Sequence, residues 1–282
     1  MEEAVNRTTF SFEPRRGDIV RGDVRTPESP GPERRTAIVV VHGFKGFKDW
    51  GFFPHAADRL AAAGHAVVSF NFSRNGVGAD LETFGELEKF GTNTFTLELE
   101  ELRSVMDQVI GGDLLGWMPE ALGVLGHSRG GGQAVIATAE DQRIDSLVTW
   151  NAIATFDRWT DEAKETWRRD GRIWIANART RQEMPLDLTL LEDFEANRDR
   201  LDILSAARRV HAPWLVVHGL ADETVDVADG RALVEAAPDA EACWIERAGH
   251  TFEARHPFAG APPELEHALG STLEHFSRTL RS

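Results

Sequence analysis

Three residue types that together perform nucleophilic catalysis occur in this chain in the order serine, aspartate, histidine. Ser128 is the centre of a Gly-x-Ser-x-Gly pentapeptide at 126–130, and Asp222 and His250 lie downstream. A serine hydroxyl is a weak nucleophile near neutral pH, so an imidazole must accept its proton while a carboxylate holds the other ring nitrogen as N–H. The expected chemistry is attack of Ser128 on an acyl carbon, with His250 as base and Asp222 as its orienting acid.

The pentapeptide separates two predicted elements. The apolar run 122–125 is typical of a buried strand, and the small residues of 133–139 predict a helix after it. Ser128 is therefore expected on a sharp turn in a strained conformation, with Gly126 and Gly130 required on either side because a Cβ would collide there. The triple glycine 130–132 is attributed to close packing of this helix on the sheet. A Gly-rich turn with an idle serine is the alternative, since 25 of the 282 residues are glycine.

Other residues compete for these roles. Asp226 is a rival for Asp222, but its place at the predicted start of a helix is typical of an N-cap. His256 is a rival for His250, but it precedes a proline in a looser segment. The remaining histidines near the predicted site, at positions 42, 127 and 218, are expected to be packed and hydrogen-bonded to backbone. No spacing such as His-Glu-x-x-His predicts a metal, so neither a metal nor a cofactor is expected.

Composition limits the classes of function. The formal net charge is −15, which argues against nucleic acid as a partner because phosphate binding needs clustered Lys and Arg. A single cysteine excludes an intramolecular disulfide. The first nine residues hold no apolar stretch of signal-peptide length, and no segment has 18 consecutive apolar residues, so we expect no membrane partner and a cytoplasmic location.

The apolar pattern predicts an α/β fold. Residues 8–25 alternate loosely and predict two antiparallel edge strands. Apolar runs predict strands at 37–41, 66–72, 122–125, 144–150, 213–217 and 242–246, and helical spacing predicts helices at 53–63, 93–110, 133–139, 226–236 and 263–280. The acidic run Glu98, Glu100 and Glu101 is expected on a solvated helix face. This repetition predicts a doubly wound, mostly parallel sheet of about eight strands whose ligand lies beyond the carboxyl ends.

Residues 155–210 interrupt the repetition. The segment is highly charged and too long for an ordinary loop, so it is expected to be a small cap insertion of helices and a hairpin near 172–185. The core would then comprise residues 1–154 and 211–282. Two uses are open for Trp159, Trp167 and Trp174, as lining of an apolar substrate pocket or as the core of the cap. Phe44 and Asn151 are better placed to contact substrate.

From about Ala37 onward the chain resembles the α/β-hydrolase superfamily, and within it the small serine esterases of the dienelactone-hydrolase-like and feruloyl-esterase-like branch. The resemblance rests on the pentapeptide, on His42-Gly43-Phe44, on the segment 218–225 that holds Asp222, and on Ala248-Gly249-His250. A dienelactone hydrolase proper uses cysteine as nucleophile, whereas position 128 here is serine. The resemblance implies the α/β-hydrolase fold.

The function expected is hydrolysis of carboxylic esters through an acyl-enzyme intermediate. The backbone N–H groups of Phe44 and Arg129 would form the oxyanion hole, and Phe44, Asn151, Trp159 and Trp174 are the candidate substrate contacts. The expected partner is a small-molecule ester, and a homodimer is compatible with the sequence. A peptidase or thioesterase with the same triad, or a ligand-binding homologue without catalysis, are the alternatives.

Overall fold

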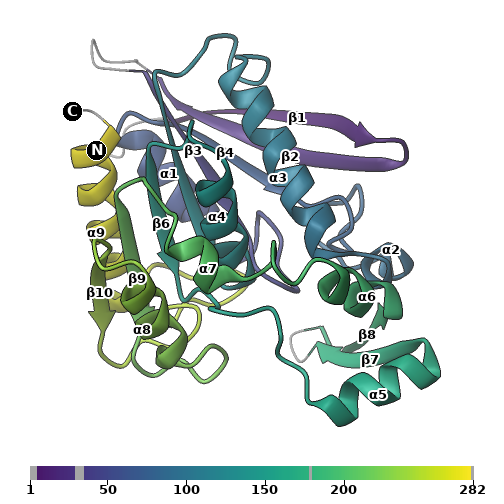
Figure 1. The fold of residues 1–282 in the computed structure, drawn as a ribbon. Coiled ribbons are helices and arrows are strands. Elements are labelled where there is room, and N and C mark those ends of the chain that lie inside the picture. Colours follow the sequence, from purple (N-terminus) through teal and green to yellow (C-terminus); the bar gives the residue numbers. More distant parts are fainter. Residues whose placement is uncertain (1–4, 29–34, 178–179, 281–282) are drawn as a thin grey trace.

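The computed structural model describes residues 5–28, 35–177 and 180–280. An eight-stranded sheet in the order β1-β2-β4-β3-β5-β6-β9-β10 crosses the molecule, with helices on both faces (Figure 1). A second sheet is a hairpin of β7 and β8. The strands are β1 Val5–Arg15, β2 Asp18–Pro27, β3 Thr36–Val41, β4 Ala66–Asn71, β5 Ala121–His127, β6 Ser146–Trp150, β7 Arg172–Asn177, β8 Gln182–Asp187, β9 Trp214–Gly219 and β10 Glu241–Ile245. The helices are α1 Phe53–Ala62, α2 Leu87–Gly91, α3 Phe95–Ile110, α4 Arg129–Glu140, α5 Asp161–Asp170, α6 Leu188–Ala196, α7 Ile203–Ala207, α8 Val227–Ala236 and α9 Pro263–Leu280.

The main sheet is parallel from β4 through β10, and only β1 and β2 run antiparallel to their neighbours. The central strands β3, β4, β5, β6 and β9 are buried along their whole length, as unbroken apolar runs require when helices cover both faces. The predicted doubly wound sheet is thereby confirmed. The prediction of two edge strands is wrong for β2, which pairs with β4 as well as β1.

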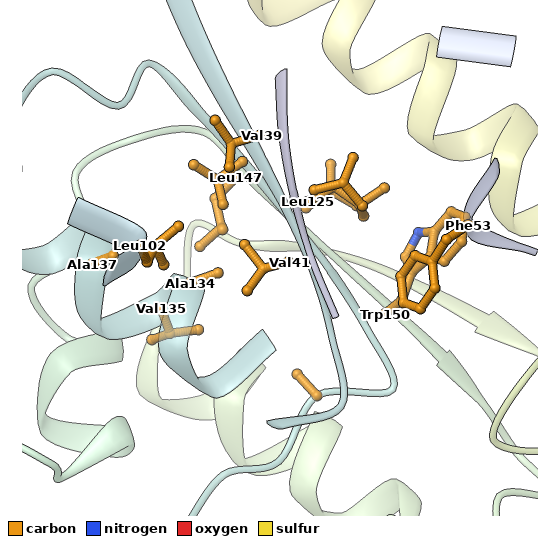
Figure 2. Close-up of a cluster of buried hydrophobic side chains, with 14 of the residues drawn as sticks. Val39, Val41, Phe53, Leu102, Leu125, Ala134, Val135, Ala137, Leu147 and Trp150 are labelled. Atoms are coloured by element: carbon orange, nitrogen blue, oxygen red, sulfur yellow. The ribbon is translucent and has the colours of Figure 1, made fainter. Parts of the chain in front are cut away.

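The core lies between the sheet and its covering helices. Side chains of β3, β5 and β6 contribute Val39, Leu125 and Leu147, and Leu102 of α3 lies near Val135 and Ala137 of α4 (Figure 2). On the other face Arg59 of α1 pairs with Glu266 of α9 at 2.8 Å. Of the helices in the described ranges, none combines the length and apolar character needed to cross a bilayer.

The segment between β6 and β9 holds α5, the β7–β8 hairpin, α6 and α7, so the predicted hairpin is present. The hairpin and α5 lie at one end of the molecule, beside α2 and α6 (Figure 1). Lys45, which follows β3, donates from Nζ to the carbonyl of Ala176 in β7 at 3.0 Å. This contact joins the hairpin to the carboxyl edge of the main sheet.

The expectation that the acidic residues of α3 face solvent is wrong for two of the three. Glu98 and Glu101 are 4% and 1% exposed, whereas Glu100 lies at the surface near Arg15. The Glu98 carboxylate accepts from Asn93 Nδ2 at 2.7 Å and Gln133 Nε2 at 2.8 Å. Glu101 accepts from the amide and hydroxyl of Ser73. The periodicity of apolar residues cannot predict a buried carboxylate that is stabilised by hydrogen bonds, because it places every acidic residue of a helix on the solvent-exposed face.

Burial of Glu101 makes stability depend on pH. Burial raises the pKa of Glu101 to about 7, although the two hydrogen bonds from Ser73 oppose the shift. The native state therefore holds this proton more tightly than the unfolded chain, so its contribution to stability is full below the unfolded pKa of 4.5 and is lost as pH rises through about 7. The full loss is on the order of 3 kcal/mol. We expect Glu101→Gln to lose this component.

Urea unfolding of the wild type, Glu101→Gln and the exposed control Glu100→Gln at pH 5 and pH 8 tests the expectation. The wild type and Glu100→Gln should lose more stability between the two pH values than Glu101→Gln. Equal losses in all three proteins would show that Glu101 does not carry the effect.

Candidate active site

Ser128 lies on the turn between β5 and α4 with φ 57° and ψ −122°, a left-handed conformation that a residue with a side chain seldom adopts. Its amide donates to the carbonyl of Trp150 at 2.9 Å. Its own carbonyl accepts from the amides of Gly131 and Ile153 at 3.0 and 3.3 Å. These bonds to α4 and to the end of β6 hold the strained turn, and the predicted conformation at Ser128 is confirmed.

The glycines around Ser128 are required by close packing. A Cβ at Gly126 would lie 2.4 Å from the carbonyl oxygen of Gly130, and one at Gly130 would lie 2.4 Å from that of His42. A Cβ at Gly131 would lie 2.5 Å from Ala152. The predicted explanation of the triple glycine, contact of the helix with the sheet and its loops, is confirmed.

Replacement of Gly130 should therefore destabilise the fold. In Gly130→Ala the new methyl meets backbone that cannot move freely, and we expect a loss of about 3 kcal/mol. The matched control is Gly270→Ala in α9, where nothing lies within 4 Å of the added Cβ, and a gain of about 1 kcal/mol is expected from helix propensity. Chemical denaturation of both variants measures the difference, and similar stabilities would contradict the packing argument.

Asp222 and His250 come together although they lie in different loops. His250 Nδ1 donates to Asp222 Oδ2 at 2.8 Å, and the other carboxylate oxygen accepts from the amides of Thr224 and Val225 at 2.8 and 2.9 Å. Burial of the carboxylate favours its neutral form, but the hydrogen bond and charge of His250 with the two amides outweigh it and lower the pKa of Asp222. An ionised Asp222 fixes Nδ1 as the protonated nitrogen and leaves Nε2 of a neutral ring free to accept a proton.

The loop after β3 lies directly against Ser128. A Cβ at Gly43 would be 2.8 Å from Ser128 Cβ and 3.3 Å from its Oγ, so only glycine fits. The amides of Phe44 and Arg129 donate to no other group within 5–28, 35–177 and 180–280. Both residues line the same pocket as Ser128, so their N–H groups remain the candidates for the expected oxyanion hole.

A pocket of about 390 Å³ opens at this edge of the sheet. Ser128 and His250 are both on its wall, with Phe44 and Arg129. No hydrogen bond joins Ser128 Oγ to the His250 ring among the contacts of the described chain, and such contacts often form only when substrate binds. The segment between β6 and β9 adds Arg158 and Asn177 to the wall.

Three of the four expected substrate contacts lie outside this wall. Asn151 is fully buried, donates to the carbonyl of His250 at 2.8 Å and accepts from the amide of Gly219 at 2.8 Å. Asn151 therefore joins the ends of β6 and β9 to the loop that holds His250. Trp159 packs on Trp167, whose indole donates to the Leu186 carbonyl, and Trp174 is 56% exposed. Of the four, Phe44 alone is on the described pocket wall.

The competing acid and histidine have other partners. Asp226 caps α8 by accepting from the amide of Ala228 at 2.8 Å, which confirms its predicted role. His256 accepts from the amide of Gly51 at 3.0 Å and stacks on Trp50. Neither contacts the pair formed by Asp222 and His250.

The neighbouring histidines are packed against backbone, as predicted. His42 Nδ1 donates to the Gly43 carbonyl at 2.9 Å, His127 Nε2 to that of His250 at 2.9 Å, and His218 Nε2 to that of Val225 at 3.0 Å. Burial lowers the pKa of His42 to about 4 against the opposing bond to Gly43, so the ring is neutral at pH 7. Within the ranges that the structure describes, no three His, Cys, Asp or Glu side chains are grouped as metal ligands.

Comparison with known proteins gives one curated relative and many structural neighbours. No family model matches the chain. The 2,6-dihydropseudooxynicotine hydrolase of Paenarthrobacter nicotinovorans is 25% identical over 206 residues, 71% of this chain, and the match spans about half (47%) of that relative's length. A protein of Agrobacterium vitis S4 superposes with a TM-score of 0.73 at 18% identity, covering 99% of this chain and 100% of its own.

Est1E from Butyrivibrio proteoclasticus superposes with a TM-score of 0.69 at 15% identity, covering 97% of this chain and 99% of its own. Both superpositions extend over nearly the whole of each chain. The chain therefore has the α/β-hydrolase fold.

Proposed function

We propose that this protein is a serine hydrolase that cleaves carboxylic esters through an acyl-enzyme intermediate. The observation that carries the proposal is the pairing of His250 with Asp222 at 2.8 Å beside a pocket that also holds Ser128 on its strained turn. A serine without a catalytic role would require neither a strained backbone conformation nor an imidazole oriented by a carboxylate in the same pocket. The hydrolase name of the curated relative supports the same class of reaction.

In the proposed reaction His250 Nε2 takes the proton of Ser128 while Oγ attacks the ester carbonyl carbon. The amides of Phe44 and Arg129 bind the oxyanion of the tetrahedral intermediate, each contributing roughly 3 kcal/mol to its stabilisation. The imidazolium returns its proton to the leaving alcohol, and the acyl group stays on Ser128. Water, deprotonated by His250, then attacks the acyl carbon, the bond to Ser128 Oγ breaks, and the imidazolium returns its proton to Oγ as the acid leaves.

We also propose that residues 155–210 act as a small cap over this site. Arg158 and Asn177 of this segment line the pocket. The β7–β8 hairpin also contacts the loop after β3, because Lys45 donates to the carbonyl of Ala176. The expected substrate is a small ester that enters between the cap and the carboxyl edge of the sheet.

Hydrolysis of p-nitrophenyl esters from acetate to palmitate tests the proposed function. A pocket of about 390 Å³ predicts that the rate peaks at short acyl chains. Est1E has been solved with ferulic acid bound, so a hydroxycinnamoyl ester belongs in the series. The thioester and anilide of the best acyl group serve as comparison, and faster cleavage of either would assign a thioesterase or a peptidase instead.

A further inference from the structure

The wall of the active-site pocket is positively charged in a strongly acidic protein. Lys45, Arg129 and Arg158 line it, and none of its described lining residues is Asp or Glu, although the chain has a formal net charge of −15. Two of these cations have close partners. Lys45 donates to the Ala176 carbonyl at 3.0 Å, and Arg158 pairs with Asp229 at 3.2 Å.

Arg129 differs from the other two cations because it is buried beside the nucleophile. It is 8% exposed, and its guanidinium carbon lies 3.7 Å from the centre of the Phe44 ring and 4.9 Å from that of Phe95. The two aromatic rings restrict the position of the guanidinium group. The guanidinium therefore packs on Phe44, and both residues line the same pocket as Ser128.

Glu98 is the one acid near Arg129 in the described chain, and it does not satisfy the guanidinium. The distance from Arg129 Nη1 to Glu98 Oε1 is 3.5 Å, longer than an ordinary N–H···O hydrogen bond. Asn93 and Gln133 already donate to the two oxygens of Glu98 at 2.7 and 2.8 Å. The Nε and Nη2 donors of Arg129 have no partner among the described residues.

A largely buried guanidinium whose Nε and Nη2 donors lack protein partners gains charged hydrogen bonds when an anionic ligand binds to it. Burial lowers the pKa of Arg129 and the charge of Glu98 opposes that shift, in agreement with a desolvated guanidinium. The Nε–H and one Nη2–H of a guanidinium point in parallel, which matches the two oxygens of a carboxylate.

We infer that the substrate carries a carboxylate close to the scissile ester and that the side chain of Arg129 binds it. The inference rests on the proposed function, because it assigns a substrate class to the same pocket. Arg129 would then have two separate roles, its amide in the oxyanion hole and its guanidinium in substrate selection. The carboxylate belongs either to the acyl part or to the alcohol part of the ester.

Matched pairs of esters that differ only in this charge test the inference. On the acyl side the pair is mono-p-nitrophenyl glutarate and its methyl ester, and on the alcohol side it is 4-acetoxybenzoate and its methyl ester. The measured quantity is the ratio of kcat/KM for the charged to the neutral member, which cancels any general effect of a variant. In the wild type we expect a ratio of about ten to one hundred in one pair, the value of a charged hydrogen bond.

Arg129→Met should bring that ratio to about one or below, Arg129→Lys should give an intermediate ratio, and the exposed control Arg278→Met should leave it unchanged. A wild-type ratio of one or less in both pairs, with Ser128-dependent turnover of the neutral esters, would overturn the inference and leave the proposed function standing.

Binding provides a readout that does not depend on turnover. Calorimetry of the Ser128→Ala protein should show tighter binding of monomethyl glutarate or 4-acetoxybenzoate than of its methylated counterpart, and Ser128→Ala/Arg129→Met should lose the difference. Equal binding of charged and neutral ligands would overturn the inference. Charge-selective binding combined with no turnover of any ester by the wild type would support the inference about the pocket and refute the esterase proposal.

Discussion

Replacement of Ser128 by alanine is expected to lower kcat for the best ester substrate by about 10⁴-fold or more. In the proposed mechanism the Ser128 hydroxyl forms the acyl-enzyme, and no second serine and no cysteine is among the described residues that line the pocket. The variant should fold, because alanine removes one oxygen atom and leaves the backbone bonds of the turn in place.

Steady-state kinetics with the ester series gives the loss in rate, and circular dichroism with thermal unfolding shows whether the variant is folded. Ser104→Ala on the surface of α3 is the matched control and should retain full activity. A folded Ser128→Ala protein with an unchanged rate would refute the proposed mechanism.

The second large effect is expected for Asp222→Asn, with a loss in kcat of about 10³- to 10⁴-fold. The asparagine amide can donate to Nδ1 of His250, which selects the tautomer with the proton on Nε2. In that tautomer the ring cannot accept a proton from Ser128. The geometry of the loop should survive, because the Oδ1 that accepts from the amides of Thr224 and Val225 is kept.

Asp226→Asn is the matched control for this change, four residues away in the same loop. Asp226 caps α8, and asparagine is an equally good N-cap, so activity and stability should both stay near wild type. A larger loss of rate in Asp226→Asn than in Asp222→Asn would reverse the assignment of the acid.

Much of the fold follows from local patterns in the sequence. The unbroken apolar runs identify the buried strands of the parallel sheet, and α9 begins and ends at the predicted residues, Pro263 and Leu280. The turn at Ser128 is predictable because its steric requirements are local to one pentapeptide. Short elements such as α2, Leu87–Gly91, are missed because five residues show too little periodicity.

The side chains around the pocket are less predictable, because their roles depend on which distant segments meet. Asn151 follows the end of a strand, which is a typical position for a substrate contact. In the structure it is fully buried and joins the ends of β6 and β9 to the loop that holds His250. Glu98 lies in an acidic run typical of a solvent-facing helix surface, and only the packing of α3 against α4 reveals it as a buried carboxylate near Arg129. The sequence identifies the Arg129 amide through the pentapeptide, but no local signal shows that its guanidinium is held between Phe44 and Phe95.

Labelling with a fluorophosphonate tests the central claim most directly, because the probe reacts with an activated serine and needs no knowledge of the substrate. Intact mass spectrometry and peptide mapping of the wild-type protein should show a single adduct on Ser128. Ser128→Ala should give no adduct, and Asp222→Asn should react much more slowly. An unlabelled wild-type protein, or an adduct on another serine, would contradict the assignment of Ser128 as the nucleophile.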